Sequence, residues 1–137
     1  ISEISKSYGA NVYKRPDNLS DDKTFKQEVI IDAISNIFNK EIEKPDIVIS
    51  LQANSPEIKY SHLDSAIRLK LKKSRKEIFS VGSDLMQNGA FRIMDYDYIF
   101  QKSISTYCGV YVCDIVDIHN EEDLNRAQDK IRRRLWN

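Results

Sequence analysis

The feature that most constrains the fold of this chain is a regular alternation between helix-like and strand-like stretches. Apolar residues recur at helical spacing over residues 25–38 and 63–71. Short apolar and β-rich runs, which are typical of buried strands, stand between and after them at residues 47–51, 78–81, 88–94 and 106–113. This alternation predicts a three-layer α/β/α sandwich around a mainly parallel sheet.

Shorter signals complete the outline. Gly9 is a natural cap for a helix over residues 1–8. Acidic residues at the start and basic residues near the end favour a closing helix over residues 121–135. The pair Asn88–Gly89 predicts a tight turn. We also expect a strand at residues 11–14, a turn and helix N-cap region at 17–22, and a short helix at 95–102.

Composition excludes several classes of protein. With 137 residues, the chain has the size of a single domain, which we expect to cover residues 1–137. The 21 basic and 21 acidic side chains cancel, so no global field attracts nucleic acid or anionic lipid. No apolar run approaches the roughly 20 residues of a membrane span, and no signal-peptide pattern opens the chain. We therefore expect neither nucleic acid nor a membrane as a partner.

The two cysteines point to a reducing compartment. Cys108 and Cys113 are five positions apart, which places them on opposite faces of one predicted strand, where they cannot easily bridge. Two small, unbridged strand residues fit a cytoplasmic protein.

Polar residues gather where two predicted strands end. Residues 51–56 follow one apolar run, and residues 116–124 follow another and lead into the closing helix. Open α/β sheets bind ligands outside the carboxyl ends of their strands, so we expect the functional site there. The four glycines are scattered and form no glycine-rich phosphate loop. The chain is therefore either a piece of a longer protein or carries out no phosphate chemistry unaided.

Four segments carry a resemblance to a known family. They are Tyr8–Asp21 (YGANVYKRPDNLSD), Asp46–Pro56 (DIVISLQANSP), Asn88–Ile93 (NGAFRI) and Asp117–Gln128 (DIHNEEDLNRAQ). In this order they resemble motifs of the acylneuraminate cytidylyltransferases, also called CMP-N-acetylneuraminic acid synthetases. Each motif is weak alone, but together they span nearly the whole chain.

The resemblance implies a nucleotide-diphospho-sugar transferase (Rossmann-like) fold and transfer of CMP from CTP to an acidic nonulosonic, sialic acid-like sugar, with release of pyrophosphate. In the family, the first strand and the CTP-binding loop would precede Ile1. We therefore expect a C-terminal portion, truncated at its N-terminus and inactive alone. The family also implies a homodimer, although the stretch between Pro56 and Asn88, which serves dimerisation in the family, is short here.

The resemblance assigns roles to individual residues. Asp117 would be catalytic and would bind Mg²⁺ (or Mn²⁺), for which a carboxylate oxygen is a suitable ligand. Gln52, Ser55 and Asn88 would bind substrate, since amides donate and accept hydrogen bonds to a polyhydroxylated sugar. Arg15 would contact phosphate or the sugar carboxylate. Structural alternatives remain open: Asp117 could cap the closing helix, Gln52 could stabilise its loop, and Asn88 could only form a turn.

His119 departs from the family pattern, because a second metal-binding aspartate is expected at its position. Imidazole is a poor ligand for Mg²⁺, so metal binding is weakened, moved to a softer ion, or lost. His119 and the short middle segment favour an alternative function, a non-catalytic sugar-binding or assembly module. The presence of Gln52, Asn88 and Asp117 favours the enzyme.

Overall fold

The computed structural model describes residues 1–21, 23–38, 43–102 and 105–135. Its contacts divide into two compact units, Ile1–Lys44 and Pro45–Asn137. The expectation of one domain over the whole chain stays a prediction.

Unit 1 is built from short helices. Its elements are α1 (Ser2–Ser7), the 3₁₀ turn η1 (Asp17–Leu19) and α2 (Lys26–Ile37). Before α2, the Asp21 carboxylate accepts hydrogen bonds from the backbone N–H groups of Lys23 and Thr24, at 3.0 and 2.7 Å. This Asp-centred turn agrees with the N-cap region expected at residues 17–22, of which residue 22 lies outside the described residues.

The strand expected at residues 11–14 is not formed, and that prediction was wrong. A strand needs a neighbouring strand to satisfy its backbone, and the described elements of unit 1 are all helical. Instead, the segment is tied to α2 by a side chain: the Tyr13 hydroxyl donates to Asp32 Oδ2 at 2.8 Å.

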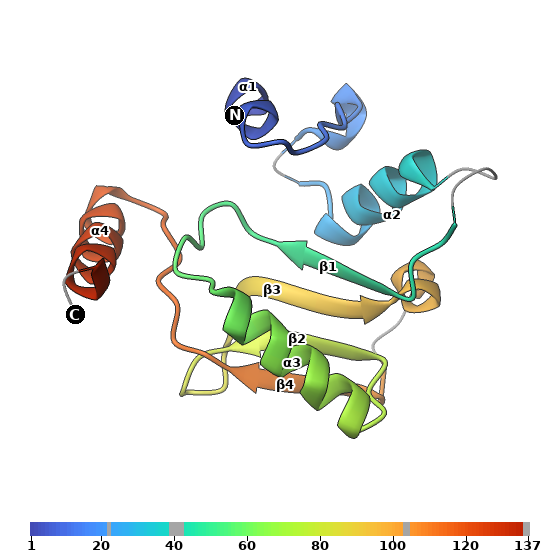
Figure 1. Cartoon of the computed structure of the whole chain (residues 1–137). Coiled ribbons are helices and arrows are strands. Elements are labelled where there is room, and N and C mark those ends of the chain that lie inside the picture. The colour runs from blue at the N-terminus through green and yellow to red at the C-terminus, as the bar shows by residue number, and fades with distance from the viewer. Residues whose placement is uncertain (22, 39–42, 103–104, 136–137) are drawn as a thin grey trace. The chain divides into compact units, whose positions relative to one another are not determined.

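Unit 2 is a mixed four-stranded sheet with helices (Figure 1). The strands are β1 (Ile47–Leu51), β2 (Glu77–Val81), β3 (Gln87–Asp95) and β4 (Cys108–Val112), in the order β1-β3-β2-β4. β3 pairs antiparallel with both β1 and β2, and only β2 and β4 pair in parallel. The mainly parallel sheet expected from the sequence is therefore corrected to a mixed one, although β1, β2 and β4 still point the same way. The chain is a mixed α/β protein.

A hairpin explains why β3 runs against its neighbours. The turn between β2 and β3 lies at residues 82–86, where the Gly82 N–H donates to Met86 O and the Leu85 N–H donates to Gly82 O, both at 2.9 Å. The turn expected at Asn88–Gly89 was misplaced, because both residues lie inside β3. Asn-Gly is a strong turn signal because both residues tolerate positive φ. Here Gly89 adopts a φ of +68° within the strand.

One face of the sheet packs against α3 (Tyr60–Lys72), as Figure 1 shows. The core cluster combines Ala66 of α3 with sheet residues Ile78, Phe91 and Ile93, all at most 1% exposed. The unit is completed by η2 (Tyr96–Phe100) and α4 (Glu121–Leu135). These elements agree with the helices expected near residues 63–71, 95–102 and 121–135. A three-layer arrangement stays a prediction.

Two sequence expectations concern the environment of the chain. Cys108 and Cys113 are free thiols, as expected from their spacing. In the part of the chain that the structure describes, no helix has the length and apolar character needed to cross a bilayer.

A partly buried ion cluster fastens α3 to the sheet. The Lys70 ammonium, on a residue only 2% exposed, pairs with Asp95 at the end of β3, and Lys76 Nζ lies 2.9 Å from the other carboxylate oxygen. Burial raises the pKa of Asp95, but hydrogen bonds from Lys70 and Lys76 outweigh it, so that the pKa lies below its ordinary value. The carboxylate therefore stays ionised and compensates the buried ammonium.

We predict that Asp95→Asn lowers the free energy of unfolding by about 3 kcal/mol, because it leaves the Lys70 ammonium buried without its counter-charge. Urea unfolding near neutral pH measures the loss. Lys76→Met is the matched control, since its half-exposed ammonium leaves the Lys70–Asp95 pair intact and should change the midpoint much less. Equal losses in the two variants would contradict the assignment.

The same cluster predicts acid sensitivity. Because the folded-state pKa of Asp95 is depressed, its contribution to stability is fully present above the unfolded value of about 3.9 and is lost as the pH falls through the folded-state pKa. The stability difference between the wild type and Asp95→Asn should therefore shrink on going from about pH 7 to about pH 3. A constant difference across this range would show that the pKa of Asp95 is the same in the folded and the unfolded chain.

Candidate functional site

The strand directions bring the sequence-predicted segments to one edge of the sheet. β1, β2 and β4 end there, and β3 begins there because it runs the opposite way. The loop after β1 is joined to the segment after β4: the Ile118 N–H donates to Asn54 O at 2.9 Å, and Asn54 Nδ2 donates back to Ile118 O at 3.4 Å. The segments 51–56 and 116–124 therefore lie together at the strand ends, as expected, and that they form a functional site stays a prediction.

Ser55, Asp117 and His119 form a connected group, here called the Asp117 cluster. Ser55 Oγ, on a residue 3% exposed, donates to Asp117 Oδ1 at 3.1 Å. His119 Nε2 lies 3.0 Å from Asp117 Oδ2. The His119 side chain is 71% exposed and that of Asp117 is 23% exposed. The carboxylate is thus held from both sides by side chains of this chain and still reaches the surface.

The capping of α4 involves other residues than Asp117. Asn120 Oδ1 accepts the Asp123 N–H at 3.0 Å, and Asp123 Oδ2 accepts the His119 N–H at 3.1 Å. This reciprocal pattern satisfies N–H groups at the start of the helix. Asp117 is therefore not the cap, which answers one of the alternatives left open by the sequence.

Gln52 lies against the first residues of β3. Its backbone N–H donates to Ala90 O at 3.0 Å, and its side-chain Nε2 occupies the space where a Cβ atom at residue 89 would stand. Residue 89 therefore has to be glycine for two reasons: its φ is positive, and the Gln52 side chain leaves no room for a Cβ atom. The amide of Gln52 is partly exposed in this position.

Asn88 has a structural task beyond forming a turn. Its Nδ2 donates to Cys113 O at 2.7 Å, and its Oδ1 accepts the Ala90 N–H at 3.3 Å. The amide thereby clamps the start of β3 to the end of β4. Substrate binding by Asn88, as by Gln52 and Ser55, stays a prediction.

Arg15 belongs to unit 1. Its Nε donates to Ser20 Oγ at 3.3 Å, and Ser20 Oγ donates to Pro16 O at 2.8 Å. The structure therefore gives Arg15 a local contact, and its part in substrate binding stays a prediction.

A cavity of about 480 Å³ opens at the same edge of the sheet. Its walls are the turn between β2 and β3, residues 114–116 and Lys130 of α4. Asp114 Oδ1 accepts the Ser83 N–H at 2.8 Å, and Asp84 Oδ1 accepts the Met86 N–H at 3.0 Å. Two carboxylates on the wall make this cavity better suited to hydroxyl or amino groups than to an anion.

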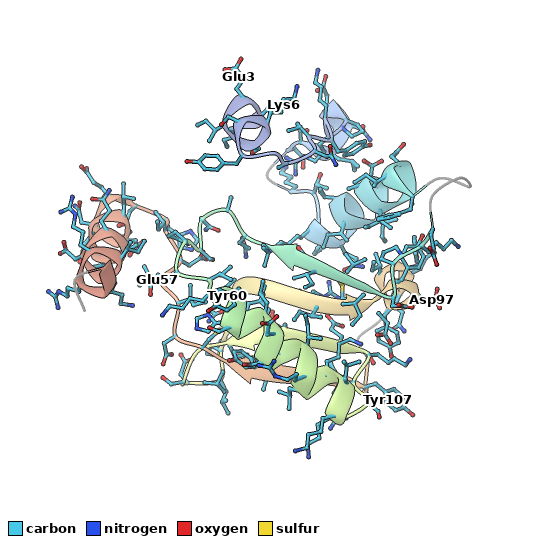
Figure 2. The ribbon with its side chains drawn as sticks, in the orientation of Figure 1. Glu3, Lys6, Glu57, Tyr60, Asp97 and Tyr107 are labelled. Atoms are coloured by element: carbon cyan, nitrogen blue, oxygen red, sulfur yellow. The ribbon has the colours of Figure 1, made fainter. Side chains whose placement is uncertain are left out.

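Sequence reasoning missed the groups around this cavity. Lys130 Nζ lies 3.3 Å from the carboxylate of Glu57, a buried residue in the loop between β1 and α3 (labelled in Figure 2). No local pattern could have revealed a pair so far apart in the chain. Asp114 did carry a signal, because it follows a predicted strand in the same way as Asp117.

The donor set at the Asp117 cluster does not fit Mg²⁺. Asp117 Oδ1 accepts the Ser55 hydroxyl, and the group beside Oδ2 is an imidazole and not a second carboxylate. Mg²⁺ prefers oxygen ligands in octahedral geometry. Among the described residues, no three His, Cys, Asp or Glu side chains are grouped so as to hold a metal ion.

Comparison with known proteins gives a partial likeness. No family model matches the sequence. The curated N-acylneuraminate cytidylyltransferase A of the zebrafish Danio rerio is 28% identical over 81 residues, which make up 59% of this chain and 18% of that protein. The chain is similar to part of a cytidylyltransferase. Because it spans less than a fifth of the relative, the activity of the whole relative does not transfer by similarity alone.

We predict that Gly89→Ala destabilises unit 2 by more than the roughly 1 kcal/mol that left-handed backbone costs an L-residue, because the new methyl group also displaces the Gln52 amide. Urea unfolding of Gly89→Ala, Gln52→Ala and the double variant separates the two effects. In the Gln52→Ala background only the backbone cost should remain. The same cost in both backgrounds would show that Gln52 does not lie over Gly89.

Proposed function

We propose that this chain is a member of the acylneuraminate cytidylyltransferases and takes part in transfer of CMP from CTP to an acidic nonulosonic sugar, with release of pyrophosphate. The ordered motifs and the partial similarity to the zebrafish protein support this assignment. The observation that carries it is the hydrogen bond from Ser55 to Asp117, because it joins the second motif to the fourth at the strand-end edge. The three-layer nucleotide-diphospho-sugar transferase fold, a homodimer and a cytoplasmic location belong to the same proposal.

In the proposed reaction, these residues position the sugar that accepts the CMP group. In the transfer, the sugar hydroxyl oxygen forms a bond to the α-phosphorus of CTP, and the bond to the pyrophosphate oxygen breaks. Asp117 is fixed by Ser55 and His119 and partly exposed, so it can accept the hydrogen bond of the attacking hydroxyl. Gln52 offers both an amide donor and an acceptor to neighbouring hydroxyl groups. Arg15 is proposed to bind phosphate or the sugar carboxylate.

A second candidate is a non-catalytic sugar-binding or assembly module. It is favoured by the engagement of both Asp117 oxygens and by the carboxylates on the neighbouring cavity wall. Under this reading the amide and carboxylate groups at the strand ends bind the sugar, but no nucleotide reacts.

We predict that N-acetylneuraminic acid binds the chain and that Gln52→Ala weakens binding by about three- to tenfold, the value of one or two neutral hydrogen bonds. Isothermal titration calorimetry measures the dissociation constants. Gln128→Ala, an amide deletion on the exposed side of α4, is the matched control and should leave binding unchanged. Absence of saturable binding by the wild type would contradict both the enzyme and the sugar-binding module and would leave only the assembly module.

The two candidates separate in a turnover assay on the protein purified from its own cells. With CTP and the sugar present, the enzyme reading predicts pyrophosphate release that Asp117→Asn reduces by a hundredfold or more, about 3 kcal/mol, without unfolding the protein. Sugar binding with no pyrophosphate release would favour the binding module. Turnover unchanged in Asp117→Asn would contradict the catalytic role of Asp117.

A further inference from the structure

We infer that the Asp117 cluster binds no divalent cation, because the His119 imidazole, and not a second carboxylate, stands beside Asp117 Oδ2. This inference deepens the proposed function, since it concerns the same site, but it rests on the contacts of the carboxylate rather than on turnover. It predicts that a divalent cation such as Mn²⁺ does not bind at Asp117 in the chain as it stands.

The first argument is the way in which Asp117 is held. Asp117 Oδ1 accepts the buried Ser55 hydroxyl at 3.1 Å, and the His119 imidazole lies 3.0 Å from Oδ2. A cation bound at Oδ2 would therefore meet an imidazole where a second carboxylate would be needed. The imidazole offers a nitrogen ligand, whereas Mg²⁺ and Mn²⁺ prefer oxygen.

The second argument is the lack of a substitute carboxylate. Asp123 Oδ2 accepts the His119 N–H at 3.1 Å and belongs to the capping pattern of α4. Asp114 Oδ1 accepts the Ser83 N–H at 2.8 Å and lies on the cavity wall. Across the described ranges, no three His, Cys, Asp or Glu side chains gather into a metal-binding group. His119 is therefore the residue whose identity decides whether a two-carboxylate site can exist here.

The third argument is that His119 can be replaced without loss of its backbone contact to α4. The His119 side chain is 71% exposed, and the contact that it makes to α4 uses its backbone N–H. His119→Asp would keep that backbone contact and would place a second carboxylate two residues from Asp117. Two neighbouring carboxylates, completed by water, offer the oxygen ligands that Mg²⁺ and Mn²⁺ prefer.

The experiment is a titration with Mn²⁺ alone, followed by paramagnetic broadening of backbone amide NMR signals. In the wild type, the signals of residues 117–120 should broaden no more than they do in Asp117→Asn. In His119→Asp they should broaden at Mn²⁺ concentrations about tenfold lower or less, and the further change Asp117→Asn should remove this gain. Asn125→Asp, which adds a carboxylate on the exposed surface of α4, controls for the added charge.

Two results would overturn the inference. Broadening of the wild-type signals that Asp117→Asn abolishes would show that the native cluster binds the cation. Failure of His119→Asp to gain Mn²⁺ affinity over Asn125→Asp, with a dispersed amide spectrum showing that it is folded, would show that His119 is not what prevents binding. Neither result depends on CTP or sugar, so failure of the cation inference and failure of the transfer reaction are distinguishable.

Discussion

The arrangement of the site depends on the direction of one strand. β3 runs antiparallel between β1 and β2, so it begins at the edge where β1, β2 and β4 end. Residues from four places in the sequence therefore meet at that edge. The hydrogen bonds of Asn54 with Ile118 and of Ser55 with Asp117 then join the loops after the two outer strands of the sheet.

The two ends of β3 make different contacts. Its last residue, Asp95, forms ion pairs with Lys70 of α3 and with Lys76, which precedes β2. These charges, together with apolar packing, hold the helix on the sheet. At the start of β3, Asn88 reaches the end of β4 and Gly89 makes room for Gln52. The partly buried ion cluster lies at one end of β3, and the polar groups of the candidate site lie at the other.

Local patterns predicted the strands and α3 of unit 2 from their apolar residues, and α4 from the order of its charges. β1 has the predicted bounds at residues 47–51. Sheet order and pairing were beyond local patterns, since they depend on contacts between distant segments. The Asn88–Gly89 signal misled because Gly89 adopts positive φ inside β3, where it also leaves room for Gln52. The strand expected at residues 11–14 does not form, because no described strand of unit 1 can pair with it.

The candidate site was partly readable from the sequence. Ser55 and Asp117 were named from their motifs and do meet, whereas the pairing of His119 with Asp117 and of Lys130 with Glu57 required the fold. The most direct test is a double-mutant cycle on Ser55→Ala and Asp117→Ala, measured by urea unfolding. A coupling energy of about 1–2 kcal/mol is predicted for a partly buried hydrogen bond to a carboxylate. Additive losses, with coupling below about 0.3 kcal/mol, would contradict the claim that the two loops form one site.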